Sequence, residues 1–152
     1  MGFQPTNEIV AVAWLKTLPG VPSNGVATTL PGDSTTWQDE GFVTVTLTGG
    51  TPDIYIPQRR PVFQLDCWAV NPNSQKPPWG KANAIAEAIA AACQPHRQRQ
   101  VFGTVTTPPQ YDDARVQTGN LESEPRRVLA DEARYADYML ELALYWVPLE
   151  AP

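Results

Sequence analysis

The clearest pattern along the chain is a run of alternating residues at positions 61–70. A period of two is typical of a strand with two distinct faces. Trp68 lies on the otherwise polar face, so this large ring either packs over its own domain or is covered by another subunit. The residues predicted to face the helices are Phe63, Leu65, Cys67 and Ala69, and those opposite are Gln64, Asp66 and Trp68.

Two segments show apolar residues at helical spacing. The first begins at Thr6 or Asn7, since either side chain can cap the free amides of a first turn, and it stops before Pro19 and Gly20. The second spans 81–93, where many small residues allow a close approach to a sheet. The predicted apolar stripes are Ile9, Val10, Ala13, Trp14 and Leu18 in the first helix, and Ala82, Ile85, Ala86, Ile89 and Cys93 in the second.

Further strands are predicted before and after these elements. The longest alternating run, 134–147, predicts a terminal strand whose register is well fixed, because a slip of one residue would exchange its two faces. The other predicted strands are 26–30, 42–48, 54–56, 102–106 and 126–129. The order of elements predicts an α+β fold, with a largely antiparallel sheet and two α-helices packed on one face.

The loops are predicted from turn-forming residues. The chain has 152 residues and 16 prolines, which punctuate it rather than forming one tract. A chain of this length predicts a single domain over 1–152. Long loops are expected at about 31–41, 71–79 and 106–125, the last as an exposed loop or arm because it holds few large apolar residues.

Composition excludes several classes of function. The net charge of −5 argues against non-specific binding of DNA as a ligand. The one histidine, His96, has no nucleophile or orienting acid in its local sequence, and the two cysteines fit no zinc pattern. The adjacent acids at 112–113 and 131–132 lack further oxygen ligands for a metal. We therefore expect no catalytic site, no cofactor, no metal, no signal peptide and no membrane span.

The strand ending in Gln64-Leu-Asp-Cys-Trp-Ala69, followed by a loop and an alanine-rich helix, resembles the tail-terminator proteins of long-tailed bacteriophages. The resemblance extends in layout over most of the chain. It implies a structural protein of the virion, made in the host cytoplasm, that forms a homohexameric ring. Such a ring caps the tail tube, stops its polymerisation and joins the tail to the head-completion proteins. DNA would be only a passing cargo in the lumen.

Six residues are candidates for contacts with a neighbouring subunit or partner. Arginine can hold a carboxylate with two parallel hydrogen bonds, and Trp and Tyr are preferred interface anchors. Exposed scattered charge, or packing over the same domain, would explain the same residues without a partner. The candidates are Arg59, Arg60, Trp68, Tyr55, Trp37 and Tyr111.

Two alternatives stay open at this stage. The first is another neck component, such as a head–tail connector or a minor tail protein, which belongs to the same class of assembly protein. The second is a small ligand-binding domain or enzyme, which tight binding of a small molecule by the monomer would reveal.

Overall fold

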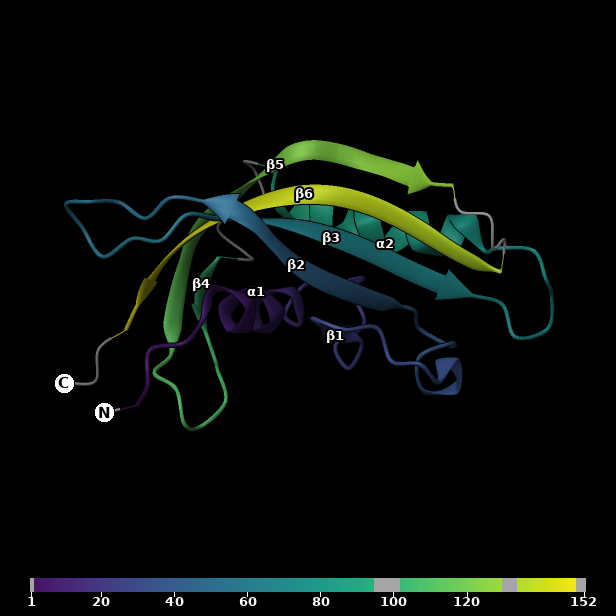
Figure 1. Ribbon diagram of the computed structural model, residues 1–152, viewed down its shortest axis with the longest axis horizontal. Helices are drawn as coiled ribbons and strands as arrows, with labels where there is room; N and C mark the ends of the chain where they lie inside the picture. The colour runs from purple at the N-terminus through teal and green to yellow at the C-terminus, as the bar shows by residue number, and fades with distance from the viewer. Residues whose placement is uncertain (1, 95–101, 130–133, 150–152) are drawn as a thin grey trace.

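The computed structural model describes residues 2–94, 102–129 and 134–149. They form a curled sheet of six strands in the order β1-β2-β3-β6-β5-β4, together with two α-helices (Figure 1). Every neighbouring pair is antiparallel except β1–β2. The α+β class and the largely antiparallel sheet are therefore confirmed. The elements are α1 (Asn7–Leu15), β1 (Val26–Ala27), β2 (Phe42–Gly50), β3 (Pro61–Val70), α2 (Trp79–Ala92), β4 (Gly103–Val105), β5 (Ala114–Val128) and β6 (Tyr135–Pro148).

The centre of the sheet is built by β3 and β6, the two strands with the clearest alternation. Their register sets Leu65 opposite Leu140 and Phe63 opposite Leu142, and all four side chains are fully buried. Opposed apolar pairs on one face are the stabilising unit of an antiparallel sheet. The buried residues of both helices, apart from Ala82, belong to the same hydrophobic cluster as these four.

Helix α1 contacts the strands at both edges of the sheet. The Thr6 side chain accepts a hydrogen bond from the Ile9 amide at 3.2 Å, which confirms the predicted cap. Trp14 is fully buried, and its ring stacks on Phe102 with centroids 5.3 Å apart. The helix contacts β1 and β2 at one end of the order and β4 and β5 at the other.

Helix α2 covers a different part of the sheet, against β3, β5 and β6. Its predicted stripe of Ala82, Ile85, Ala86 and Ile89 is buried. Cys93 is only partly buried, and Ala92 completes the stripe one residue earlier.

The predicted loop at 106–125 is wrong over most of its length, because β5 begins at Ala114. The strand has few large apolar residues because many of its side chains are exposed. Its register against β6 shifts around residues 116–118, 121–123 and 123–126, and Pro125 lies within the last of these irregularities. Proline is tolerated in strands at such bulges.

Smaller differences concern short segments. The segment 54–56 forms bends rather than a strand, and β1 is limited to two residues. Loops are present at 31–41, which holds a short 3-10 helix at Ser34–Thr36, and at 71–78. His96 and the acids at 131–132 lie outside the described residues.

The end of β2 provides a test of the backbone geometry. Gly50 has φ +104°, and a Cβ there would lie 2.1 Å from the Arg60 carbonyl oxygen, whereas a Cβ on Gly49 would meet no atom within 4 Å. We expect Gly50→Ala to lower the free energy of unfolding by roughly 1–3 kcal/mol or more. The matched Gly49→Ala should change it by less than about 0.5 kcal/mol. Urea unfolding of both variants checks this, and equal losses would contradict the close approach.

Candidate interaction surfaces

The loop between β2 and β3, residues 51–60, projects beyond the end of the sheet and is called the hairpin tip (Figure 1). Asp53 organises it: one carboxylate oxygen accepts hydrogen bonds from the amides of Tyr55 at 2.8 Å and Ile56 at 3.1 Å. The other oxygen forms an ion pair with Arg60 at 2.6 Å. These backbone hydrogen bonds, with a smaller contribution from the Arg60 charge, lower the pKa of Asp53. At neutral pH Asp53 is therefore ionised, which is the form that accepts these hydrogen bonds and pairs with Arg60.

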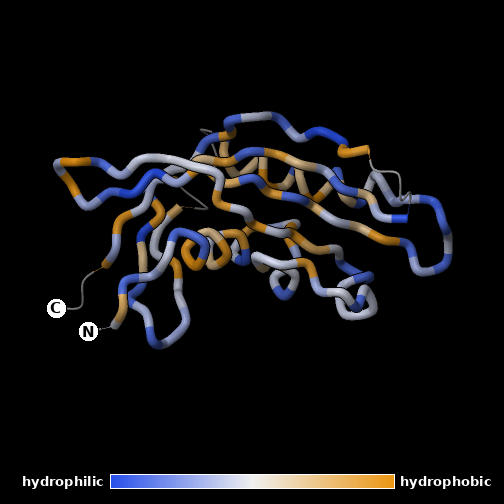
Figure 2. Tube along the Cα trace, in the orientation of Figure 1, coloured by the Kyte–Doolittle hydropathy of each residue, from blue (hydrophilic) through white to orange (hydrophobic). Residues whose placement is uncertain are grey.

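The hairpin tip presents apolar side chains to solvent. Ile54 is 83% exposed, Tyr55 89% and Ile56 52%. Figure 2 shows this as a hydrophobic segment at the far end of the hairpin, between hydrophilic flanks. Single exposed apolar residues are ordinary on a protein surface, whereas here three in succession form one exposed apolar patch.

The two candidate arginines hold the hairpin to the last strand. The backbone of Arg59 exchanges two hydrogen bonds with Trp146, at 2.8 and 3.0 Å. Its guanidinium lies 5.6 Å from the centroid of the Trp146 ring, and that of Arg60 lies 5.8 Å from the Tyr145 ring. Cations over aromatic faces are attracted by the ring quadrupole. Both arginines therefore have contacts in their own chain, and Arg60 keeps a side chain that is 43% exposed.

The two candidate tryptophans lie in a second, smaller cluster. Trp37 is 4% exposed, packs against Phe42 and Tyr135, and donates a hydrogen bond to the Pro31 carbonyl at 3.3 Å. This burial corrects its prediction as an interface residue, because its ring is covered by its own chain. Trp68 is only partly buried and donates to the Thr44 hydroxyl at 3.0 Å.

Tyr111 is the candidate closest to the N-terminal segment. Its backbone forms an isolated bridge with Phe3, which is itself 71% exposed. The structure thus brings Tyr55, Arg59 and Arg60 together at the hairpin, and it places Trp37, Trp68 and Tyr111 on other parts of the molecule.

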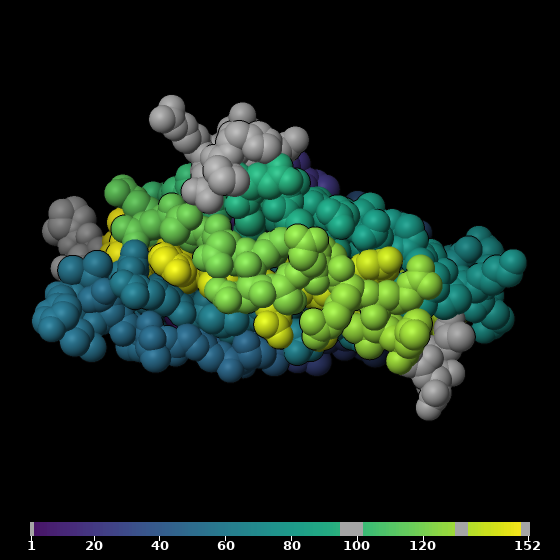
Figure 3. All heavy atoms as spheres, turned by 90° about the horizontal axis from the view of Figure 1, so that it is seen from above, coloured from purple at the N-terminus to yellow at the C-terminus, as the bar shows by residue number. Residues whose placement is uncertain are grey.

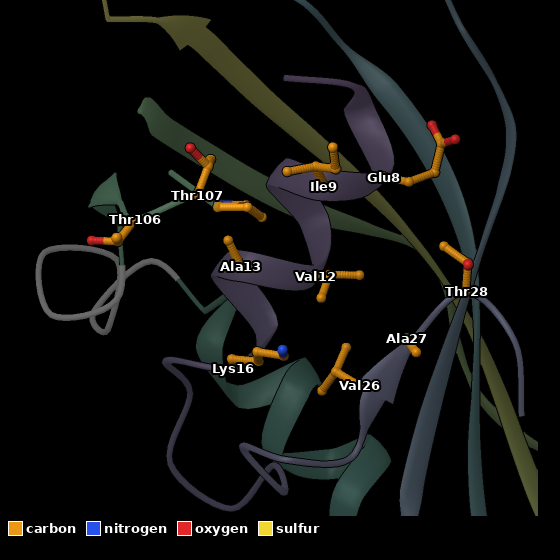
Figure 4. A pocket seen from close by; sticks show the side chains of 11 residues that line it. Glu8, Ile9, Val12, Ala13, Lys16, Val26, Ala27, Thr28, Thr106 and Thr107 are labelled. Carbon is orange, nitrogen blue, oxygen red and sulfur yellow. The ribbon is translucent and has the colours of Figure 1, made fainter. Parts of the chain in front are cut away.

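A pocket of about 430 Å³, the α1–β1 pocket, opens between helix α1, strand β1 and the segment after β4. Figure 4 shows Val12 extending from the helix toward the side of β1. The sequence analysis did not predict this pocket, since it depends on how the curled sheet brings 106–108 beside the helix. The lining residues are Glu8, Ile9, Val12, Ala13, Lys16, Val26, Ala27, Thr28, Thr106, Thr107 and Pro108.

The face of β3 and β6 opposite the main cluster carries a pair of carboxyl groups, Asp66 and Asp137. Asp137 lies opposite Trp68 in the register, and Asp66 opposite Met139, so the two acids are diagonal neighbours. Figure 3 shows atoms of β6 between β5 and the β2–β3 hairpin on this side of the molecule. Asp66 also accepts a hydrogen bond from the Gln64 amide at 3.2 Å.

Asp137 is only 9% exposed, and its Oδ1 has no hydrogen-bond partner among the described residues. Burial, followed by the charge of Asp66 and a hydrogen bond with it, raises the pKa of Asp137 to about 8. At neutral pH the Asp137 carboxyl group is therefore mostly protonated.

The outer edge of β5 is a further surface. Strand β4 pairs only with residues 114–116, so among the described strands none pairs with the rest of that edge. Pro125, exposed charges at Glu122, Glu124 and Arg126, and register shifts mark this stretch. Natural edge strands carry such features to prevent indiscriminate strand pairing.

Two observations concern the described ranges alone. Residues 2–94, 102–129 and 134–149 hold no group of three or more His, Cys, Asp or Glu side chains placed to bind a metal ion. No helix within the same ranges is long and apolar enough to cross a membrane.

The carboxyl pair generates a prediction about pH. Because the pKa of Asp137 is raised in the folded state, the folded protein keeps a proton that the unfolded chain loses above about pH 4. The free energy of unfolding should therefore fall as the pH rises from about 4 to about 8. Asp137→Asn should remove this fall and stabilise the protein at pH 8 by on the order of 1–3 kcal/mol.

The control is Glu141→Gln, which removes one carboxylate from the same strand and face. Urea unfolding between pH 4 and pH 8 should give it the pH profile of the unmodified protein. If Asp137→Asn keeps the wild-type slope, a raised pKa of Asp137 does not cause the pH dependence.

Comparison with known protein families and with curated proteins finds no match to this sequence.

Proposed function

We propose that this chain is a structural protein of a long-tailed bacteriophage that forms a ring on the end of the tail tube. The ring stops tube polymerisation and joins the tail to the head-completion proteins. No covalent chemistry is required for this function, because capping follows from two different surfaces on the ring. One surface binds the last ring of tube protein, and the other lacks the surface that a further ring of tube protein needs.

The resemblance that leads to this proposal covers a unit with defined structure. The residues that carry it form the end of β3, the following loop and α2. At the end of β3, Val70 and Trp68 belong to the second hydrophobic cluster. Ala69 of β3 packs with Ala82 of α2. The predicted order of strand, loop and helix is the one found.

The hairpin tip is the observation that carries the proposal furthest. Ile54, Tyr55 and Ile56 are exposed on a loop that Asp53 and Arg60 hold in place. Apolar side chains presented on an ordered projection are costly in water, and they are stabilised when another chain covers them. A protein that functions by assembly has such a surface in its free subunit.

We further infer that both helices cover one face of the sheet and leave the other for neighbouring molecules. Support comes from the shared cluster, in which Val10 of α1 and Ile89 of α2 join Leu65 and Leu140 of the sheet. On the opposite face, Trp68 and Met139 remain only partly buried.

The proposed partners are further copies of the chain in a closed ring of six, the tail-tube protein and a head-completion protein. The proposed location is the tail or neck of the virion, after assembly in the host cytoplasm. The net charge of −5 supports a lumen that DNA passes without binding, since like charges repel phosphates. A lumen lined by arginine would contradict this part of the proposal.

One observation favours the ligand-binding alternative, namely the apolar α1–β1 pocket of about 430 Å³. Its volume falls in the range of roughly 300–1,000 Å³ that small-molecule sites occupy. The neck-connector alternative shares every surface described here, and only the identity of the bound partner separates it from a terminator.

The direct test is tube growth in the presence of the purified protein. Tail-tube protein of the same phage would be polymerised with and without substoichiometric amounts of this chain, and tube lengths measured by electron microscopy. We expect shorter tubes that carry a cap at one end. Unchanged lengths together with binding to the head-side connector would instead identify a connector, and binding to neither would contradict an assembly role in the neck.

A further inference from the structure

We propose that the hairpin tip of one subunit inserts into the α1–β1 pocket of the next, so that each chain carries both halves of one repeating contact. This inference rests on the proposed ring, because it names the surfaces that join the ring's subunits. Both halves are apolar and both are uncovered in the single chain.

The wall of the α1–β1 pocket is formed by the face of α1 that is not buried in the domain. Residues 9–15 of this helix are apolar without interruption. Val10, Ala11, Trp14 and Leu15 are buried in the domain, whereas Ile9, Val12 and Ala13 are only partly buried and line the pocket. A helix that is apolar on all sides is normally covered on all sides. The pocket therefore marks where a cover from outside the chain is expected.

The tip half is fixed by hydrogen bonds within its own chain. The Asp53 carboxylate fixes the amides of Tyr55 and Ile56, and the hydrogen bonds between Arg59 and Trp146 anchor the base of the hairpin to β6. A loop that is rigid before it binds loses little conformational entropy on binding. Tyrosine at the apex adds a large apolar ring with one polar group, a common anchor in protein interfaces.

The two halves match in chemical character. The pocket has an apolar centre, and Glu8 and Lys16 lie at opposite ends of its helical wall. The tip has an apolar apex beside the ion pair of Asp53 and Arg60. An apolar centre within a rim that carries charges of both signs is the usual anatomy of a specific protein interface.

The tip cannot serve its own pocket. None of the residues lining the pocket comes from 51–60, and in Figure 1 the tip projects beyond the end of the sheet while α1 and β1 lie beneath its middle. A knob and a hole on different parts of one surface produce a heterologous contact. Such contacts close into rings when the rotation between subunits permits it, and otherwise form open filaments.

The contact can be trapped with a disulfide that forms only between subunits. Tyr55→Cys protein would be mixed with Val12→Cys protein, both carrying Cys93→Ala; Cys67 is fully buried and stays. The control mixture replaces Val12→Cys with Glu87→Cys, an exposed position on α2. After oxidation we expect at least about tenfold more disulfide dimer than in the control, because the contact raises the effective concentration of the two thiols.

A second pair of variants separates this contact from the ring itself. Ile54→Asp places a charge in the apex, and Leu129→Asp is its control, since Leu129 is 80% exposed but lies outside the tip. We expect Ile54→Asp to abolish the assemblies that the unmodified protein and Leu129→Asp form in electron micrographs.

Each outcome decides between the two proposals. Rings that persist in Ile54→Asp, with no disulfide above the control, would overturn the tip-in-pocket contact and leave the ring intact. A strong disulfide without closed rings would support the contact and count against the ring. Monomers throughout, with no disulfide above the control, would overturn both.

Discussion

The packing of α1 between the two ends of the strand order is the interaction on which the rest of the structure depends. The sheet curls so far that β1 and β4 approach the same helix, yet they do not pair with each other. Trp14 of this helix is fully buried, and its ring stacks on Phe102 with centroids 5.3 Å apart. Burial of a side chain of this size stabilises the fold by roughly 2–3 kcal/mol or more. Without α1, the core would lose the cover that this helix gives at β1, β2, β4 and β5, while α2 would still pack against β3, β5 and β6.

The same packing sets the positions of the two apolar surfaces in the proposed contact. Since α1 closes the sheet from below, its second apolar face turns outward and forms the wall of the α1–β1 pocket. The hairpin with Ile54, Tyr55 and Ile56 at its tip extends in another direction. Backbone hydrogen bonds between Arg59 and Trp146 join the base of this hairpin to β6, a central strand of the sheet. The fold thus separates two apolar surfaces that each need a cover, which is the arrangement a head-to-tail assembly requires.

Sequence patterns predicted the parts of the fold in which one face is buried and the other is not. The alternation in β3 and β6 and the apolar stripe of α2 predict these elements, because each has one buried face and one more exposed face. The sequence predicts a loop over most of β5 and a strand only at 126–129, because the edge and much of one face of β5 meet solvent and its side chains are short or charged. Trp37 looked like a surface anchor because only the folded loop brings Phe42 and Tyr135 around it. The pairing of Asp66 with Asp137 depends on the register of two strands far apart in the sequence, which no local pattern reveals. The sequence predicts a short strand for the three apolar residues of the hairpin tip, whereas they lie in an exposed loop.

The claim that assembly is the function of this chain is tested most directly by its mass in solution. Light scattering on the purified protein, with negative-stain images of the same sample, measures both stoichiometry and shape. We predict a particle of six 16.7 kDa subunits that appears as a ring with a central hole. A monomer at every concentration, which also fails to form rings on added tail-tube protein, would contradict the proposal.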